Sequence, residues 1–256
     1  MLELSTPVQY VKGIGPKIAE ILAAKGIRTV DDLLHYLPFR YEDRLNPRGI
    51  GELRAGEMAT VIGEVRNSGL FRTRRMPIFQ LTVGQGRAKL RCLWFNATYL
   101  QDKFKPGQLV ALYGKVEADE RTRELQIIQP QIEMLGEPEE DGSTAGAEKK
   151  AAESLEIGRI VPIYESAGQG KLSPRWFRRV IRTALDNLTP ELPEPIPAIV
   201  RSRLALVSPR EALWNVHWPE PGESFQDLQS SRTPAHLRLI FDELFFVELG
   251  DRKSVV

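Results

Sequence analysis

The sequence has very little of the residues that build disulfides and metal clusters. Cys92 is the single cysteine, which excludes an intrachain disulfide. Three histidines are scattered along the chain: His35, His217 and His236. A zinc cluster needs several Cys or His ligands at close spacing, so none is expected. A chain without disulfides fits a reducing compartment, and we expect a cytoplasmic protein.

Long apolar runs are also missing. No stretch approaches the ~20 apolar residues that cross a bilayer. The N-terminus, MLELSTPVQYVKGIG, lacks the basic head and apolar stretch of a secretory signal. Hydrophobic residues make up 42% and charged residues 27% of the 256 positions. We therefore expect no membrane association and enough chain for one large domain or two smaller ones.

Catalytic motifs are the third absence. The stretch GQGKLS (168–173) superficially resembles a phosphate-binding P-loop. That loop needs a glycine five residues before its Gly-Lys pair, where Glu165 stands, and Ser or Thr after the lysine, where Leu172 stands. No Ser-His-Asp, Cys-His or paired-carboxylate arrangement can be argued from the spacing. We therefore expect no catalytic residue, metal or cofactor in this chain.

The net charge is only +1, but its distribution is uneven. Between Arg54 and Lys115 eleven Lys and Arg stand against three acidic residues, a net charge of +8. Between Glu137 and Glu156 seven acidic residues stand against two lysines, a net charge of −5. The basic window indicates either a site for a polyanion or an ordinary solvated surface.

Residues 1–48 carry helix signals. Pro16 suits a first helical turn and Gly26 a helix end, while Thr29 can cap a second helix that stops before Pro38. The sequence GIG indicates a helix-hairpin-helix-like turn, whose free backbone N–H groups attract phosphate. A tight turn between packed helices explains the glycines equally well. The candidate phosphate contacts there are Gly13, Gly15 and Lys17.

Residues 49–136 change to a two-residue period. Five segments rich in β-branched and aromatic residues alternate in this way: 58–69, 76–83, 87–96, 108–118 and 123–135. A short helical or turn segment, ATYLQDKFKPG, separates the third from the fourth. This order predicts a five-stranded OB-fold barrel, a fold whose open face commonly binds oligonucleotides. With the helical segments, the fold class is α+β.

The remaining chain divides by composition. Residues 137–154 are acidic and poor in apolar side chains, which predicts a flexible linker. Residues 155–250 predict an α-rich connector: a strand over 158–164, then a helix capped by Ser173 with Pro174 in its first turn. The apolar stripe of that helix indicates a core-facing side, and a strongly apolar helix covers 234–249.

The segment LRCLWFNATYL raises the question of function. In a strand, Ala88, Leu90, Cys92 and Trp94 share one apolar face, and Lys89, Arg91, Leu93 and Phe95 share the other. A phenylalanine on a face with two cations is well placed to stack on a nucleobase, and the cations to attract phosphates. Tyr99 follows four residues later and is expected close by. The stretch LFRTRRMP adds Arg72, Arg74 and Arg75 at a loop tip.

Two structural explanations remain open for the aromatic pair. Phe95 can pack under the segment 97–104 and merely cap the barrel. A β-bulge in the strand would also exchange the two faces, turning Trp94 outward and Phe95 inward.

Several motifs together resemble one family. They are KGIGPKIAEILAAKGIRTVDDLLHYLPFRYEDR, LWFNATYL, IVPIYE, KLSPRWFRRVI, REALWNVHWPE and HLRLIFDELFFVEL, in this order. The chain is similar to the N-terminal, wedge-containing part of the RecG family of ATP-dependent DNA helicases. The resemblance covers nearly the whole chain, and YEDR (41–44) and RLIFDELF (238–245) are its most specific pieces.

The resemblance implies a function in DNA repair and recombination. The family remodels stalled replication forks and Holliday junctions: an OB-like wedge splits the strands while a motor that binds ATP and magnesium draws in duplex. The family's stacking aromatics match Phe95 and Tyr99, and the basic residues of its wedge hairpin match Arg72, Arg74 and Arg75. It further implies a monomer, branched DNA and single-strand-binding protein as partners, and a cytoplasmic, nucleoid-associated location.

The motor is expected soon after the RLIFDELF helix, and this sequence stops at Val256. Its last six residues, DRKSVV (251–256), match one reading frame of a common sequencing adapter. We therefore expect a non-native tail and a fragment of a longer helicase that is inactive alone as an ATP hydrolase. The alternatives are a stand-alone OB-fold protein that binds single-stranded nucleic acid without ATPase, and a protein-interaction module.

Overall fold

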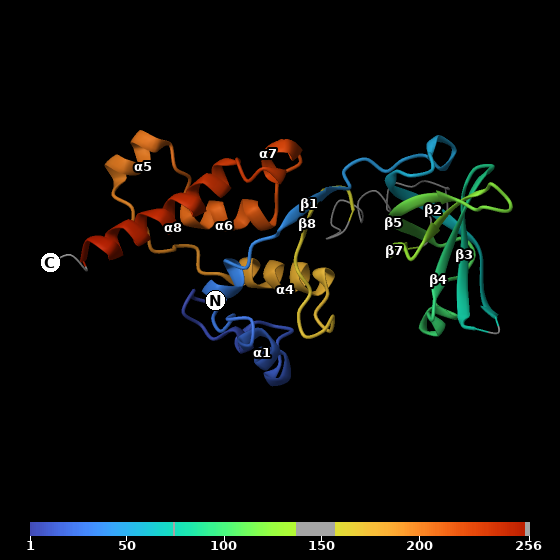
Figure 1. The fold of residues 1–256 in the computed structure, drawn as a ribbon, viewed down its shortest axis with the longest axis horizontal. Helices are drawn as coiled ribbons and strands as arrows, with labels where there is room; N and C mark the ends of the chain where they lie inside the picture. The colour runs from blue at the N-terminus through green and yellow to red at the C-terminus, as the bar shows by residue number, and fades with distance from the viewer. Residues whose placement is uncertain (74, 137–156, 254–256) are drawn as a thin grey trace. The chain divides into compact units, whose positions relative to one another are not determined.

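The computed structural model describes residues 1–73, 75–136 and 157–253 (Figure 1). The predicted acidic linker (137–154), Arg74 and the last three residues of the predicted tail lie outside this range. The chain forms two compact units, and it passes between them twice. The helical unit comprises residues 1–43 and the chain from residue 160 onward, and the barrel unit comprises residues 44–159.

The helical unit joins the two ends of the chain in one hydrophobic core. Stretches 1–48 and 155–250, which the sequence separates, both contribute to it. Its elements are η1 (Val8–Tyr10), α1 (Pro16–Ala23), α2 (Val30–Leu34), β1 (Arg40–Asp43), β8 (Ile160–Ile163), α4 (Pro174–Asn187), α5 (Ala198–Leu204), α6 (Pro209–His217), α7 (Phe225–Gln229) and α8 (Pro234–Lys253).

The capping residues of the helical unit act as the sequence predicts. Thr29 accepts a hydrogen bond from the backbone N–H of Asp32, whose carboxylate accepts one from the N–H of Thr29, so α2 begins with a capping box. Ser173 accepts from Trp176, and Pro174 is the first residue of α4. Helix α2 ends at Leu34, well before the proline predicted to stop it.

The glycine turn near the N-terminus differs from the predicted arrangement. GIG follows the short helix η1 and precedes α1, so it does not join α1 to α2. The two helices are joined instead through Gly26, whose φ of +84° suits a residue without a Cβ. The turn packs on the helical unit, because a Cβ on Gly13 would lie 3.7 Å from Val180 of α4.

Two buried tyrosine–histidine pairs hold the helical unit together. The carbonyl of Leu34 lies 2.7 Å from Nε2 of His217 and can only accept, so Nε2 carries the proton. Nδ1 is then free to accept from the hydroxyl of Tyr164 at 2.8 Å. In the second pair, Tyr41 of the YEDR box donates to the carbonyl of Val216 and lies 3.1 Å from Nε2 of His236. Tyr41 of the box is therefore a structural anchor.

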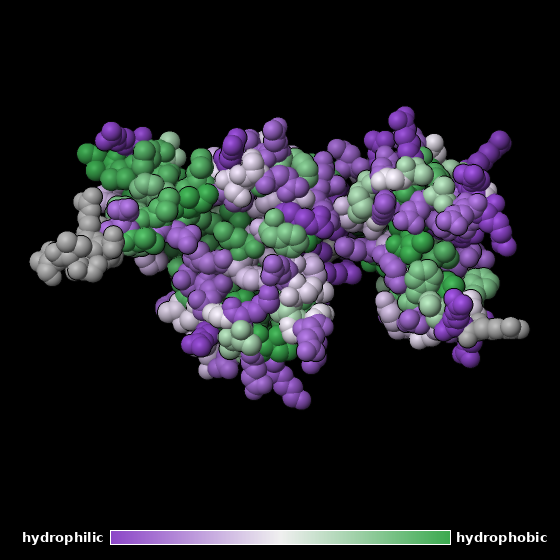
Figure 2. All heavy atoms as spheres, in the orientation of Figure 1, coloured by the Kyte–Doolittle hydropathy of each residue, from purple (hydrophilic) through white to green (hydrophobic). Residues whose placement is uncertain are grey.

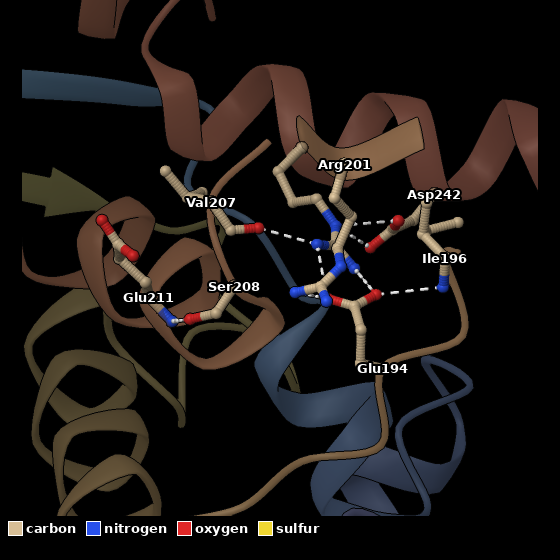
Figure 3. A network of polar contacts seen from close by, with 8 residues as sticks. Glu194, Ile196, Arg201, Val207, Ser208, Glu211 and Asp242 are labelled. Atoms are coloured by element: carbon tan, nitrogen blue, oxygen red, sulfur yellow. Dashed lines mark hydrogen bonds and ion pairs between the residues drawn. The ribbon is translucent and has the colours of Figure 1, made fainter. Parts of the chain in front are cut away.

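Arg238 ties the proline-rich segment after α4 to α8, and Figure 3 labels its partners Glu194, Val207 and Asp242. Its side chain is fully buried and donates two hydrogen bonds to Glu194, at 2.8 and 3.0 Å. It also donates to Asp242, one turn along α8, and to the carbonyl of Val207. A buried guanidinium is tolerated because every partner is supplied by the fold. Hydrophobic residues gather on the surface over α5 and the C-terminal part of α8 (Figure 2).

The barrel unit is a closed OB-fold barrel, which confirms the predicted α+β fold class. Its strands follow the order β2–β3–β4–β6–β5, and β5 pairs again with β2 to close the barrel. A bulge between Val65 and Asn67 bends the long β2, so that its first half pairs with β5 and its second with β3. The elements are η2 (Ile50–Glu52), β2 (Met58–Arg72), β3 (Pro77–Gln85), β4 (Ala88–Phe95), η3 (Thr98–Leu100), β5 (Leu109–Ala118), β6 (Leu125–Ile128) and β7 (Gln131–Gly136).

The fifth strand differs from the prediction of one continuous segment over 123–135. It is split into β6 and β7 at Gln129 and Pro130. Gln129 has a φ of +53°, and Pro130 has no N–H to donate to a ladder. Gly114 of β5 lets this break approach closely, because a Cβ there would lie 2.6 Å from Ile127. In the part of the chain that the structure describes, no helix is both long and apolar enough to cross a membrane.

Candidate nucleic-acid interface

Strand β4 separates the two neighbouring aromatics as the alternation predicts. Its inward side chains are buried: Leu90, Cys92 and Trp94. Its outward side chains are exposed or partly exposed: Lys89, Arg91, Leu93 and Phe95. Trp94 is only 4% exposed and donates its indole N–H to the carbonyl of Pro130 at 2.9 Å. The pairing of β3 with β4 runs without a register shift, so no bulge exchanges the two faces and Phe95 turns outward.

Phe95 is partly exposed at the end of β4. Asn96 follows with a φ of +55°, which turns the chain out of the strand. The next residues close the barrel end: Ala97 and Leu100 are buried in its core, and Phe104 lies against Phe79 with ring centroids 5.8 Å apart. The segment 97–104 therefore fills the barrel with its own side chains, and Phe95 keeps part of its surface open.

Tyr99 projects from η3 and is 64% exposed. Its neighbour Leu100 faces the core, so the one-residue step along the short helix turns the phenol outward. The ammonium of Lys103 lies 5.2 Å from the centroid of the Tyr99 ring. This cation–π contact places a positive charge beside an exposed aromatic ring. The sequence analysis counted Lys103 in the basic window and did not assign it to the site, because the contact with Tyr99 depends on the turn after η3.

The β2–β3 hairpin carries the predicted loop arginines. Arg72 and Arg75 are exposed, and Arg74 lies outside the described residues. The side chain of Thr73 holds the turn: its hydroxyl donates to the carbonyl of Met76 at 2.7 Å and accepts from two backbone N–H groups. The hairpin tip and η3 lie at the same end of the barrel (Figure 1). The structure thus brings Phe95, Tyr99, Arg72 and Arg75 to one end of the barrel.

The other two predicted cations of β4 are differently placed. Lys89 pairs with Gly84 near the start of the strand, about 20 Å from Phe95 at the rise of an extended chain. Arg91 lies between them and forms an ion pair with Asp119 and a 2.9 Å hydrogen bond to Gln126. Backbone N–H groups of residues 121 and 122, with Arg91, lower the pKa of Asp119 to about 2. Arg91 therefore has a partner in the barrel unit that is charged at neutral pH.

The predicted phosphate contacts of the N-terminal turn belong to the helical unit. Gly13, Gly15 and Lys17 are all exposed. Gly15 is the N-cap of α1 with extended backbone angles, and a Cβ on it would meet no atom within 4 Å. Open backbone at a helix N-terminus is compatible with an anion, and a packed turn explains the same geometry. The three residues stay predicted contacts.

Comparison with known proteins gives the family. A family model described as the RecG wedge domain matches residues 7–188. The ATP-dependent DNA helicase RecG of Thermotoga maritima is 28% identical over 254 residues, covering 98% of this chain and 29% of the relative. That of Escherichia coli K12 is 32% identical over 242 residues, covering 94% of this chain and 32% of the relative.

A solved structure agrees with these relatives. The structure of RecG bound to a three-way DNA junction matches with a TM-score of 0.76 and 26% identity, covering 99% of this chain and 32% of that chain. The chain thus spans about a third of the length of the relatives it matches. The matches run through both units and include β4 and the hairpin. The chain therefore belongs to the RecG wedge domain family.

Proposed function

We propose that this chain is the part of a RecG-type helicase that binds branched DNA and splits its strands at the branch point. The observation that carries the proposal is the outward turn of Phe95 at the end of the barrel that also carries the exposed Tyr99 and the basic hairpin. An exposed aromatic offers a flat face to an unpaired base. Stacking of this kind contributes about 1–3 kcal/mol per base.

The positive charges also support the proposal that this end of the barrel faces DNA. Arg72 and Arg75 are exposed on the hairpin, and Lys103 stands beside Tyr99. Cations in these places neutralise phosphates and fix the register of a strand, while the rings meet the bases. We do not assign Arg91 a phosphate, because Asp119 and Gln126 hold its guanidinium. We propose that Lys89, on the same face of β4, contacts a phosphate farther from Phe95.

The geometry suits a wedge better than a simple groove. Trp94 anchors the end of β4 from inside, through its hydrogen bond to Pro130, and this holds the strand that presents Phe95. A rigid ring at a fixed strand end can replace a base pair as a stacking partner where two strands part. The solved relative is described as bound to a three-way DNA junction, a substrate with such a parting point.

We propose that the motor activity of the helicase belongs to a part of longer relatives that this chain does not match. ATP and magnesium would be bound by a motor, and this chain would supply recognition and strand separation. This division follows from the P-loop pattern that residues 165–173 fail to match. In the full helicase, we propose, the wedge acts in fork repair and recombination.

A fluorescence anisotropy titration of the 256-residue chain tests the proposal. Its three ligands are a labelled three-way fork, a linear duplex and a single strand of equal length. Phe95→Ala should lower the preference for fork over duplex by about 5- to 150-fold, the equivalent of ~1–3 kcal/mol. Leu93→Ala is the matched control, because Leu93 is a partly exposed apolar residue on the same face of β4. Phe95→Tyr should retain the preference.

Equal losses on fork and duplex would contradict the wedge role. Tighter binding of the single strand than of the fork would indicate the alternative, a stand-alone single-strand-binding barrel.

A further inference from the structure

A second aromatic ring lies on the outer face of the barrel, in line with Phe95. The strand register pairs Phe71 with Ile78 and Ile78 with Phe95. Residues paired directly across strands share a face. The adjacent row, Leu70–Phe79–Trp94, packs into the barrel core. The row Phe71–Ile78–Phe95 therefore lies on the outer face and crosses three strands; we call it the outer row.

Phe71 has no part in the core. Its side chain is 55% exposed, and it is absent from the residues that pack in the barrel. The ring leans back over Gly69, with its Cε2 atom 3.6 Å from the place a Cβ would take. The strand supports one side of the ring while more than half of its surface stays open to solvent. In Figure 2 hydrophobic residues interrupt the hydrophilic surface of the barrel toward the hairpin end.

The surroundings of Phe71 are positive and rigid. Arg72 follows it directly, and Arg75 stands in the turn that the Thr73 side chain clamps. Among residues 1–73, 75–136 and 157–253, the structure gives neither arginine a carboxylate partner. An exposed ring beside cations without acidic partners matches a ligand that is both aromatic and negatively charged. Single-stranded nucleic acid has these properties.

We propose that Phe71 is a second base-stacking residue of this wedge and receives an unpaired nucleobase of the DNA strand that contacts Phe95. The inference rests on the proposed function, and it adds a contact that neither the sequence nor the family pattern indicated. Neighbouring strands lie about 4.8 Å apart, so the two rings are separated by about 10 Å across the outer row. At 3.4 Å per stacked nucleotide, this distance corresponds to about three nucleotides. Ile78 lies between the rings and covers the intervening bases.

The experiment compares three variants of the 256-residue chain on forks with an unpaired gap of zero, one, three or five nucleotides at the branch. Phe71→Ala should weaken binding about 5- to 150-fold on the three- and five-nucleotide gaps and leave the gapless fork unchanged. Phe95→Ala should weaken binding on every fork. Met58→Ala is the matched control, because Met58 is 54% exposed on the same strand at the opposite end of β2.

The gap series separates the two proposals. If Phe71→Ala behaves like Met58→Ala on every fork while Phe95→Ala weakens binding, the proposal for Phe71 is wrong and the wedge function stands. If neither Phe71→Ala nor Phe95→Ala weakens binding on any fork, both the proposal for Phe71 and the proposed wedge function are wrong. A loss from Phe71→Ala that is equal on all four gap lengths would also overturn the stacking role, because it would not depend on unpaired bases.

Discussion

Replacing Trp94 with Phe should destabilise the barrel and leave its preference for forked DNA intact. Trp94 is buried, lies 5.9 Å from Phe79 between ring centroids, and satisfies the carbonyl of Pro130. Phenylalanine keeps an aromatic ring in place but has no N–H. The carbonyl at the break of the fifth strand would then lose its partner within the barrel.

The magnitude follows from two losses. A buried polar group left without its partner costs about 1–3 kcal/mol. The carbon atoms removed from the core cost about 0.8 kcal/mol each, or roughly 1–2 kcal/mol together. The free energy of unfolding of the barrel should therefore fall by about 2–5 kcal/mol. Phe95→Leu, which changes a partly exposed outer residue, should change it by less than about 1 kcal/mol.

Hydrogen–deuterium exchange read by mass spectrometry measures this effect unit by unit. Peptides from β3 to β6 should lose protection in Trp94→Phe, while peptides from α4 serve as the internal reference in the helical unit. The same two variants should also be titrated with fork and duplex under conditions where both are folded. The order of their losses in fork preference should be the reverse of the order of their losses in stability. Phe95→Leu should lose fork preference and Trp94→Phe should keep it. The reasoning is refuted if Phe95→Leu is the more destabilising change.

Two further predictions concern charge and acid. Replacing Arg72 and Arg75 with Ala should reduce the slope of log affinity against log salt for a fork by about 2, since each phosphate contact contributes ~0.9. Lys115→Ala is the control, because Lys115 is exposed on β5. An unchanged slope in the double variant would exclude these contacts. Burial lowers the pKa of His217 from 6.5 to about 4, so the folded state favours the neutral ring that accepts from Tyr164. The stability that this residue contributes is fully present above pH 6.5 and falls by about 1.4 kcal/mol per pH unit as pH drops toward 4. Urea unfolding of the helical unit at several pH values measures this for wild type and His217→Gln. Equal slopes of unfolding free energy against pH in the two proteins would contradict the prediction.

Local signals predicted the parts of the fold that local physics decides. The two-residue alternation of β4 predicted which aromatic enters the barrel, because a single slip would bury two cations. Thr29 and Ser173 marked helix starts, because their hydroxyls can accept the first free N–H groups. The break in the fifth strand was readable from Pro130 and was missed, since the flanking residues continue the alternation on both sides.

Long-range contacts were beyond the sequence pattern. Arg91 was predicted to face a phosphate, and its partner Asp119 lies 28 residues away, directly after the end of β5. The shared core of the two chain ends depends in the same way on contacts between distant segments. Phe71 was missed because its alignment with Phe95 exists only through the register of two strand pairings.

The most direct test of the central claim is the ratio of fork to duplex affinity for wild type and Phe95→Ala at one fixed salt concentration. The account predicts that the ratio falls by about fivefold or more while the duplex affinity stays constant, since the ring meets only unpaired bases. A ratio that stays unchanged in a correctly folded Phe95→Ala chain would contradict it.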